Sequence, residues 1–230
     1  MCGLACFLHA PRRSVADGAK PSIYVFLQLD AKASMVERTL QERLPKMTVT
    51  LFGRFRDFEE ALTRARPDAI LSITPVLVQR GATPVLQGKR GGSSSEPFVL
   101  ASVNQPLAGS LAGKSIGIVD LFGREGTQTF LNDLLKTKDV KIKRVTKVED
   151  LLALLDLSVA DGIVLANSTL FQLSERTRLV LKSKDLPGAP VGLAALAVLN
   201  PTVRDVAIQS VKALDASTNR LLGVDSWSIP

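Results

Sequence analysis

Continuous apolar runs of strand length alternate with amphipathic helical segments from Lys20 onward, and this alternation constrains the fold more than any other feature. Residues 22–29 (SIYVFLQL) form an uninterrupted apolar run, which is typical of a strand buried on both faces of a parallel sheet. Val36, Leu40 and Leu44 then share one face of a helix. Repeats of strand, helix and strand favour a parallel sheet with right-handed crossovers, so the sequence predicts an α/β protein.

The first unit continues with strands at 47–52 and 68–73. We expect the helix between them to begin at Asp57, because Glu60 follows at the spacing of a capping box. Residues 81–95 are rich in glycine, serine and proline, which indicates a strand flanked by exposed loops before a further strand in EPFVLASV.

A second unit repeats this order, with strands at 115–120 and 140–145 on either side of a helix that starts near Gly126. Thr146 and Glu149 form another capping-box pattern, which predicts a helix there before the next strand.

Corresponding aspartates mark the two units, because Asp68 in RPDAILSI and Asp161 in VADGIVLA each stand directly before a buried strand. Asn200 and Pro201 have the pattern of a helix start, and the segment that follows is expected to fold back on the first unit. The predicted architecture is two Rossmann-like lobes with mainly parallel sheets, joined by two hinge crossovers. Its boundaries are lobe 1 at 20–104 and 188–230, lobe 2 at 105–187, hinges near 103–106 and 186–191, and a flexible tail or signal remnant at 1–19.

The net charge of the chain excludes few classes of partner, whereas the distribution of the charged residues along the chain excludes more. A formal net charge of +7 and a pI near 9.6 are compatible with nucleic acid, a membrane surface or an anionic small molecule as partner. The lysines and arginines are scattered among acids, however, and their densest clusters lack interleaved aromatics, so we expect no nucleic-acid binding. No apolar run reaches the roughly 18 residues of a membrane span.

Residues for enzymatic or metal chemistry are scarce in the predicted lobes. Cys2, Cys6 and His9 all lie in the first residues, so a disulfide scaffold, a cysteine or histidine metal site and a Ser-His-Asp triad are not expected. GSLAGKS is one residue short of a phosphate-binding Walker loop, and GREG lacks the dinucleotide-binding glycine pattern. We therefore assign no catalytic residue, no metal and no cofactor.

Ligands of open α/β sheets bind beyond the carboxyl ends of the strands. The turns expected there carry short polar side chains and the free amides of helix N-termini, although each of these side chains has a structural helix cap as its alternative role. The candidate ligand-binding residues are Lys32, Ser34, Thr74, Arg124, Thr127, Gln128, Asn167 and Ser168.

The stretch LAGKSIGIVDLFGREGTQTFLNDLL, together with VADGIVLA, resembles the phosphate/phosphonate-type substrate-binding proteins of ABC importers. In that family L-x-G-K-x-I-G, a turn and G-T recur at the entry to the second lobe. The resemblance implies a hinged periplasmic binding protein of type II, in which helix N-termini and Arg124 would hold an anion. The chain departs from the family at the turn, because Gly123 to Gly126 replace the hydroxyl-bearing Ser-x-Ser-Gly and place Glu125 there.

The leading functional prediction is a solute-binding protein that captures a small ligand, with an anion as one candidate class, between two lobes for an ABC-type importer, and that is not an enzyme. Two alternatives use the same fold: a transport-defunct sensory or interaction module, and a small-molecule biosynthetic enzyme. The expected partners are the ligand and an ABC permease. We expect a monomer located in the periplasm or cell envelope, the location being implied by the resemblance.

Overall fold

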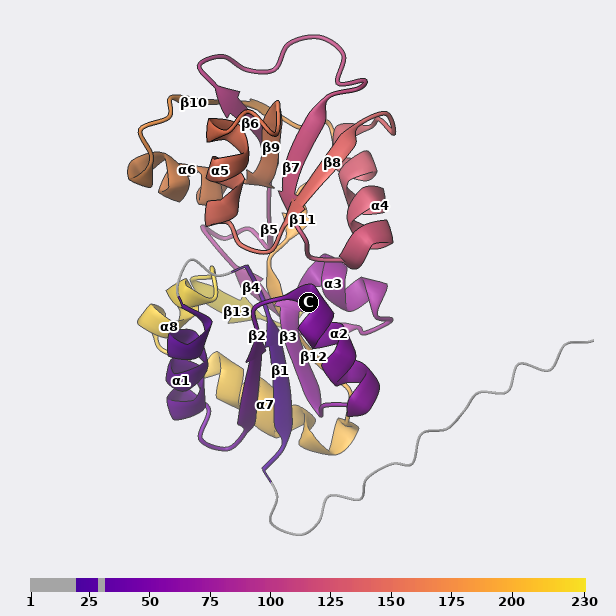
Figure 1. Cartoon of the computed structure of the whole chain (residues 1–230). Coiled ribbons are helices and arrows are strands. Elements are labelled where there is room, and N and C mark those ends of the chain that lie inside the picture. The colour runs from indigo at the N-terminus through magenta and orange to yellow at the C-terminus, as the bar shows by residue number, and fades with distance from the viewer. Residues whose placement is uncertain (1–19, 29–31) are drawn as a thin grey trace, which may run out of the picture.

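The computed structural model describes residues 20–28 and 32–230, which form two α/β lobes, one above the other in Figure 1. The predicted fold class is confirmed, since each lobe has its own sheet with helices on both faces. The predictions on the first residues of the chain, from the signal remnant to His9, lie outside the described residues. Among the described residues, no helix has the length and apolar character needed to cross a membrane.

Lobe 1 is built on a six-stranded sheet in the order β13-β4-β12-β3-β1-β2, in which β1, β2 and β3 are parallel. Helices α1 and α7 pack on one face of it, and α2 and α3 on the other. The elements are β1 (Ser22–Phe26), α1 (Ala33–Arg43), β2 (Thr48–Phe52), α2 (Phe55–Arg64), β3 (Ala69–Ile73), α3 (Thr74–Gln79), β4 (Pro84–Lys89), β12 (Ala194–Val198), the 3-10 helix η1 (Pro201–Val203), α7 (Arg204–Lys212), α8 (Ala216–Leu221) and β13 (Ser226–Ser228).

Lobe 2 is built on a five-stranded sheet in the order β10-β6-β9-β7-β8, in which β7, β8 and β9 are parallel. Helix α4 packs on one face, and α5 and α6 on the other. The elements are β6 (Phe98–Val103), β7 (Ser115–Val119), α4 (Gly123–Leu135), β8 (Lys141–Val145), α5 (Glu149–Asp156), β9 (Gly162–Ala166), α6 (Asn167–Arg176) and β10 (Leu181–Asp185).

The first boundary between the lobes lies earlier in the chain than the sequence predicted. The sequence analysis placed residues 98–103 in lobe 1, but they form β6, which pairs antiparallel with β9 and β10 in the sheet of lobe 2. An apolar strand such as β6 fits the middle of either sheet equally well, so its composition does not reveal which sheet it joins. The chain instead leaves lobe 1 between β4 and β6, about ten residues earlier than the hinge expected near 103–106.

The two segments that connect the lobes run side by side as a short antiparallel pair, β5 (Ser95–Glu96) with β11 (Val191–Gly192). Figure 1 shows both strands in the narrow region between the sheets. Because the pair belongs to neither large sheet, it is the part of the chain about which the two lobes would move.

Both predicted capping boxes are wrong. Helix α2 begins at Phe55, before Asp57, and α5 begins at Glu149 with Val148 at the N-cap, and neither start has a side-chain capping bond. Burial overrides the polar pattern there, because Phe55 and Val148 are themselves core residues. The predicted N-cap at Asn200 is confirmed, since its side chain accepts the backbone N–H of Thr202 at 3.2 Å, although the first turn is the 3-10 helix η1 and α7 begins only at Arg204.

The two aspartates that precede buried strands have the same role in each lobe. Asp68 accepts the backbone N–H of Ser22 at 2.8 Å and the side-chain amide of Asn200 at 2.7 Å. Asp161 accepts the backbone N–H of Ser115 at 2.7 Å. Each carboxylate therefore ties the start of one parallel strand to the start of the next. These hydrogen bonds hold the pKa of both carboxyls below the ordinary value; for Asp68 they outweigh partial burial, which acts in the opposite direction.

We expect Asp68→Asn to lower the free energy of unfolding at pH 7 by about 1–2 kcal/mol, because the hydrogen bonds to a charged acceptor are lost. The folded pKa of Asp68 is lowered, so its contribution to stability is present above the unfolded pKa of about 3.9 and is lost as the pH falls through the folded value. The variant should therefore lose less stability than the wild type on acidification below about pH 4. Urea unfolding at several pH values measures both effects.

Asp156→Asn is the matched control, because Asp156 is exposed at the end of α5 and makes no ion pair with a described residue. The role of Asp68 would be refuted if the two variants had the same stability at pH 7 and the same dependence on acid.

Candidate functional site

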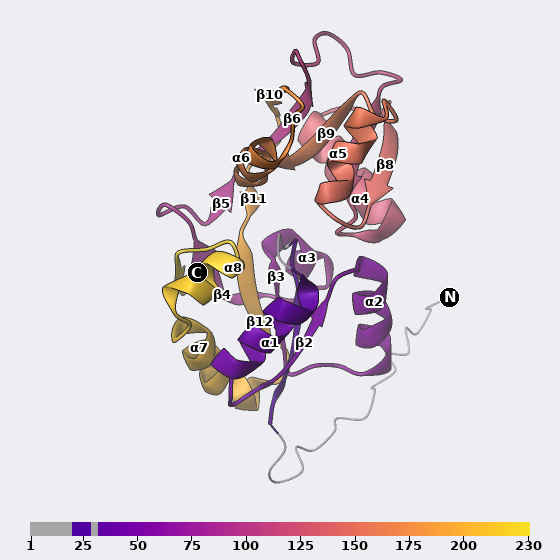
Figure 2. The ribbon, with the colours of Figure 1, turned by 60° about the vertical axis from the view of Figure 1, so that its left-hand side comes forward.

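A cavity of about 380 Å³ lies between the lobes and takes residues from both of them and from the connecting pair. Lobe 1 contributes the loop after β1, the end of β3 and the end of α8, and lobe 2 contributes β6 and the face of α6 that is turned to lobe 1. Figure 2 shows α6 and α8 on the same side of the molecule, next to β11. The cavity is thus at the position where a ligand would contact both lobes.

The start of helix α6 forms the polar wall on the lobe 2 side. Strand β9 is buried along its whole length and leads directly into α6, whose N-cap residue, Ala166, has no capping side chain. Ser168, Gln172 and Arg176 are spaced four residues apart, so they lie on one face of the helix, and all three line the cavity. The positive end of the helix dipole therefore faces the cavity together with these side chains.

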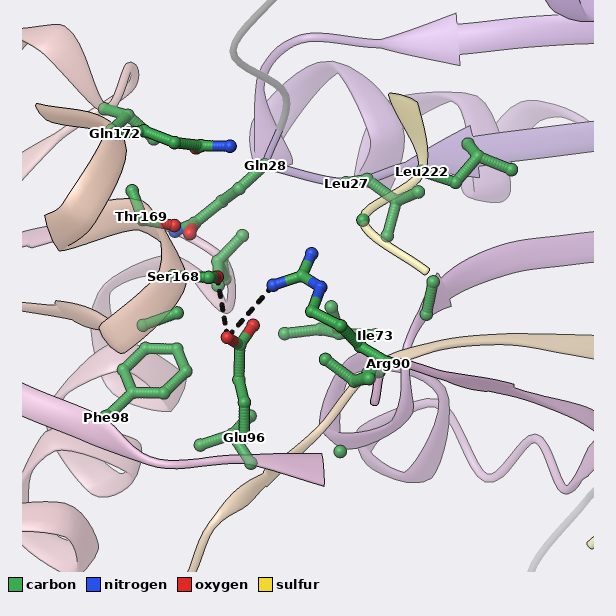
Figure 3. Close-up of a pocket in the computed structure, with 18 of the residues that line it drawn as sticks. Leu27, Gln28, Ile73, Arg90, Glu96, Phe98, Ser168, Thr169, Gln172 and Leu222 are labelled. Atoms are coloured by element: carbon green, nitrogen blue, oxygen red, sulfur yellow. Dashed lines mark hydrogen bonds and ion pairs between the residues drawn. The ribbon is translucent and has the colours of Figure 1, made fainter. Parts of the chain in front are cut away.

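A three-residue polar network crosses the floor of the cavity (Figure 3). Glu96 of β5 accepts the hydroxyl of Ser168 at 2.6 Å and pairs with the guanidinium of Arg90 at 3.2 Å, both through Oε2. The Glu96 side chain is only 20% exposed. Gly223 has a φ of +74°, which favours glycine, and a Cβ atom there would lie 2.7 Å from a terminal guanidinium nitrogen of Arg90. The network joins lobe 1, the connecting pair and lobe 2.

Two more arginines stand at the edge of the cavity, Arg176 at the end of α6 and Arg220 in α8. Both residues are exposed, and neither makes an ion pair with any of the residues in 20–28 and 32–230. Helix α8 is held in place at both ends: Asp215 accepts the N–H of Thr218 at 2.8 Å, and Asn219 accepts the indole N–H of Trp227 at 2.8 Å. The cavity residues therefore include three arginines and one carboxylate.

The rest of the wall is largely apolar. Leu27 and Ile73 of lobe 1, Phe98 and Leu121 of lobe 2 and Val191 of the connecting pair all line it. Gln28, from the loop after β1, extends into the same space (Figure 3). A cavity that combines an apolar wall with polar groups directed inward is the usual form of a small-molecule site.

Residues Gly123 to Gly126, the turn at the start of α4, do not line this cavity, although the sequence predicted an anion-binding site there. A Cβ on Gly123, whose φ is +69°, would lie 2.9 Å from the Phe55 ring of lobe 1, and one on Gly126 would lie 2.5 Å from the Gln79 amide. Phe122 belongs to a hydrophobic cluster whose other members are mostly from lobe 1. The two glycines therefore allow the start of α4 to pack against α2 and α3, where an anion had been expected.

Of the residues proposed from the sequence, Ser168 lines the cavity and the other seven do not. Thr74 donates its hydroxyl to Gln87 at 2.9 Å, and Thr127 donates to Asp120 at 2.9 Å, so both hydroxyls serve local structure. The remaining side chains lie elsewhere: Lys32 and Ser34 are exposed at the start of α1, Arg124 is exposed on α4, Gln128 donates to Asn132 within α4, and Asn167 is exposed beside Ser168.

Most of the polar residues that line the cavity were not predicted from the sequence. Arg90 lies in the Gly/Ser-rich segment 81–95, which was expected to be a strand with exposed loops, and Glu96 is the first residue of the strand predicted in EPFVLASV; neither pattern indicated a ligand. Gln172 and Arg176 could have been found from Ser168 by helical spacing. Arg220 had no local signal, because its position depends on how the C-terminal segment returns to lobe 1.

Groups of three or more His, Cys, Asp or Glu side chains that could hold a metal are absent from the described part of the chain. The cavity residues are guanidinium, hydroxyl and amide groups with one carboxylate, a set suited to hydrogen bonding and to charge neutralisation of an anion.

No protein-family model matches the chain, and no curated protein sequence matches it. Solved structures match most of its length. The substrate-binding protein of an amino acid ABC transporter is 17% identical, with a TM-score of 0.58 over 87% of this chain and 97% of that chain. The ligand-binding component of an ABC-type import system from Staphylococcus aureus, with zinc bound, is 14% identical, with a TM-score of 0.55 over 89% of this chain and 79% of that chain.

The periplasmic aliphatic sulphonate binding protein SsuA from Escherichia coli is 15% identical, with a TM-score of 0.53 over 89% of this chain and 74% of that chain. These three structures are binding proteins, and at such low identity their similarity establishes the fold alone. The chain therefore has the two-lobed α/β fold found in the substrate-binding proteins of ABC importers.

Proposed function

We propose that this protein is a solute-binding protein that holds a small anionic ligand in the cavity between its lobes. The observation that carries the proposal is the cavity of about 380 Å³, to which both lobes and the connecting pair contribute polar side chains. A ligand bound there would bridge Arg220 of lobe 1 and Arg176 of lobe 2. Its binding free energy would then favour the closed arrangement of the lobes.

The charges at the cavity support an anion as ligand. Arg90, Arg176 and Arg220 outnumber the single carboxylate, Glu96, and Arg90 is already paired with it. The two arginines at the edge remain to make charge-assisted hydrogen bonds, which are roughly twice as strong as neutral ones. A phosphate or phosphonate ligand is not part of this proposal, because Gly123 to Gly126 lack the hydroxyls of the Ser-x-Ser-Gly turn.

Delivery to an ABC permease and a location in the periplasm or cell envelope are part of this proposal. Their support is the fold shared with ABC importer proteins, and one of these is described as periplasmic.

A thermal-shift panel of carboxylates, sulfonates, phosphonates and amino acids tests the proposal. A ligand at about 100 times its dissociation constant stabilises the folded state by about 2.7 kcal/mol, which raises the melting temperature by several degrees. We expect Arg220→Ala to weaken the binding of a hit about tenfold or more, equivalent to about 1.4 kcal/mol or more, as measured by calorimetry.

Arg38→Ala is the matched control, because Arg38 is an exposed arginine on α1 that does not line the cavity. Equal loss of affinity in both variants would indicate a general charge effect and contradict a role for Arg220. A panel without any hit would contradict the solute-binding proposal.

The apolar contact at the start of α4 favours a second candidate, an interaction module whose lobes stay together without ligand. Phe122 of lobe 2 shares a cluster with Phe26, Phe55 and Phe58 of lobe 1, so the closed arrangement has support outside the cavity. Small-angle scattering separates the two candidates: a solute-binding protein contracts when a hit is added, and the interaction module keeps the same radius of gyration.

A further inference from the structure

We propose that Glu96 is a specificity-determining residue that excludes small inorganic oxyanions from the cavity. Its carboxylate occupies the place between Arg90 and Ser168 that a sulfate or phosphate ion would otherwise take. The inference rests on the proposed function, because it assigns a role within the same cavity.

The contacts of Glu96 are those that an oxyanion would make. One carboxylate oxygen accepts a hydroxyl from Ser168 at 2.6 Å, within the range of charge-assisted O–H···O⁻ bonds, and also contacts the guanidinium of Arg90 at 3.2 Å. Ser168 lies in the first turn of α6, where the helix dipole favours negative charge. A hydroxyl, a guanidinium and a helix start would together bind an external anion if this carboxylate were absent.

The backbone holds Glu96 in this position. Glu96 pairs with Val191 across the two connecting strands, which directs its side chain into the cavity, and the backbone of Arg90 exchanges two hydrogen bonds with that of Ser93. The carboxylate is therefore tethered close to its partners, and a free anion would have to compete with a group of high effective concentration. A free anion would also be repelled by the carboxylate that it displaces.

The position of the Glu96 carboxylate in the cavity determines which class of ligand fits there. At Glu96 a ligand meets an acceptor of hydrogen bonds, so the ligand atom that faces it must be a donor, such as a hydroxyl, amide or ammonium group. The anionic group of the same ligand is then left to Arg176 and Arg220 at the edge of the cavity. The site is thus suited to an organic anion with a separate donor group and not to a bare inorganic anion.

Sodium sulfate titrated into the full chain tests the proposal, with sodium chloride at equal ionic strength as the reference. We expect Glu96→Ala to bind sulfate at least about tenfold more tightly than the wild type by calorimetry, with a melting temperature raised by several degrees over chloride. Glu96→Gln is the matched control, because its amide fills the same space, and it should show no gain. Adding Arg90→Ala to Glu96→Ala should remove the gain.

Circular dichroism in chloride establishes that each variant is folded, and Glu96→Ser replaces Glu96→Ala if the alanine variant is unfolded. The proposal is overturned if neither small variant binds sulfate more tightly than the wild type, or if Glu96→Gln gains as much as Glu96→Ala. The result is separable from the proposed function, since sulfate is used whatever the natural ligand is. A gain of sulfate binding with no hit in the ligand panel would refute solute binding, and with it a role of Glu96 in specificity, but would still show that its carboxylate keeps sulfate out of the cavity.

Discussion

Phe122→Ala is expected to separate the two lobes without unfolding either of them. Phe122 is 6% exposed, its ring centroid lies 4.6 Å from that of Phe130, and most of the cluster around it belongs to lobe 1. Truncating a buried phenylalanine removes about 3–5 kcal/mol of stabilisation. Phe130 belongs to α4 of lobe 2, but most of the other residues in the cluster belong to lobe 1, so the loss should appear chiefly as opening.

Small-angle scattering is the measurement for Phe122→Ala, and we expect a larger radius of gyration with a nearly unchanged far-ultraviolet circular dichroism spectrum. Phe171→Ala is the matched control, because Phe171 is 67% exposed on α6 and its truncation should change stability by no more than about 0.5 kcal/mol. Identical scattering from Phe122→Ala and the wild type would show that the α4 contact does not hold the lobes together.

Phe58→Ala is expected to lower the free energy of unfolding of lobe 1 by about 3–5 kcal/mol, because a buried ring is lost and a cavity is left behind. Phe58 is completely buried, its ring stacks on Phe26 with centroids 5.1 Å apart, and it is tilted against Phe52 at 5.6 Å. These partners all lie in lobe 1, so in contrast to Phe122 the loss should appear as unfolding. A lower urea midpoint and a lower melting temperature are the measurements.

Phe58→Leu separates the loss of volume from the loss of hydrophobic character. Leucine fills part of the space, so we expect this variant to be markedly more stable than Phe58→Ala. A loss of less than about 1 kcal/mol in Phe58→Ala would contradict the close packing of this ring against Phe26 and Phe52, since full truncation of a buried phenylalanine costs more than that.

Local capping patterns predicted one of three helix starts correctly. The start at Asn200 was predicted correctly because an N-cap amide and a following proline act within three residues. The starts predicted at Asp57 and Thr146 failed because the helices begin where Phe55 and Val148 are buried, and burial of apolar side chains outweighs one capping bond.

Fewer features of the candidate site than of the fold could be predicted from the sequence. Ser168 was found because a polar residue just after a buried strand is a local signal. Glu96 was missed because it meets Ser168 across 72 residues of chain, and nothing in GKRGGSSSEP indicates such a contact. Arg90 was missed with it, because Arg90 belongs to the site through its ion pair with Glu96. The GREG turn was given too much weight, since a helix start is as suited to packing against another lobe as to binding an anion.

The α/β class, the two repeating units and the matching positions of Asp68 and Asp161 could be predicted from the sequence, because apolar periodicity and a polar residue at a strand start act over a few residues. The hydrogen bonds that these aspartates make to Ser22 and Ser115 span 46 residues each and were shown by the structure. Only the tertiary structure decided that β6 joins lobe 2, that α4 packs on α2 and α3, and that Glu96 lies between Arg90 and Ser168. Each of these depends on contacts between segments far apart in the chain. Such contacts are selected by how side chains of particular shapes fit together in the folded core, and composition and local pattern do not specify that fit.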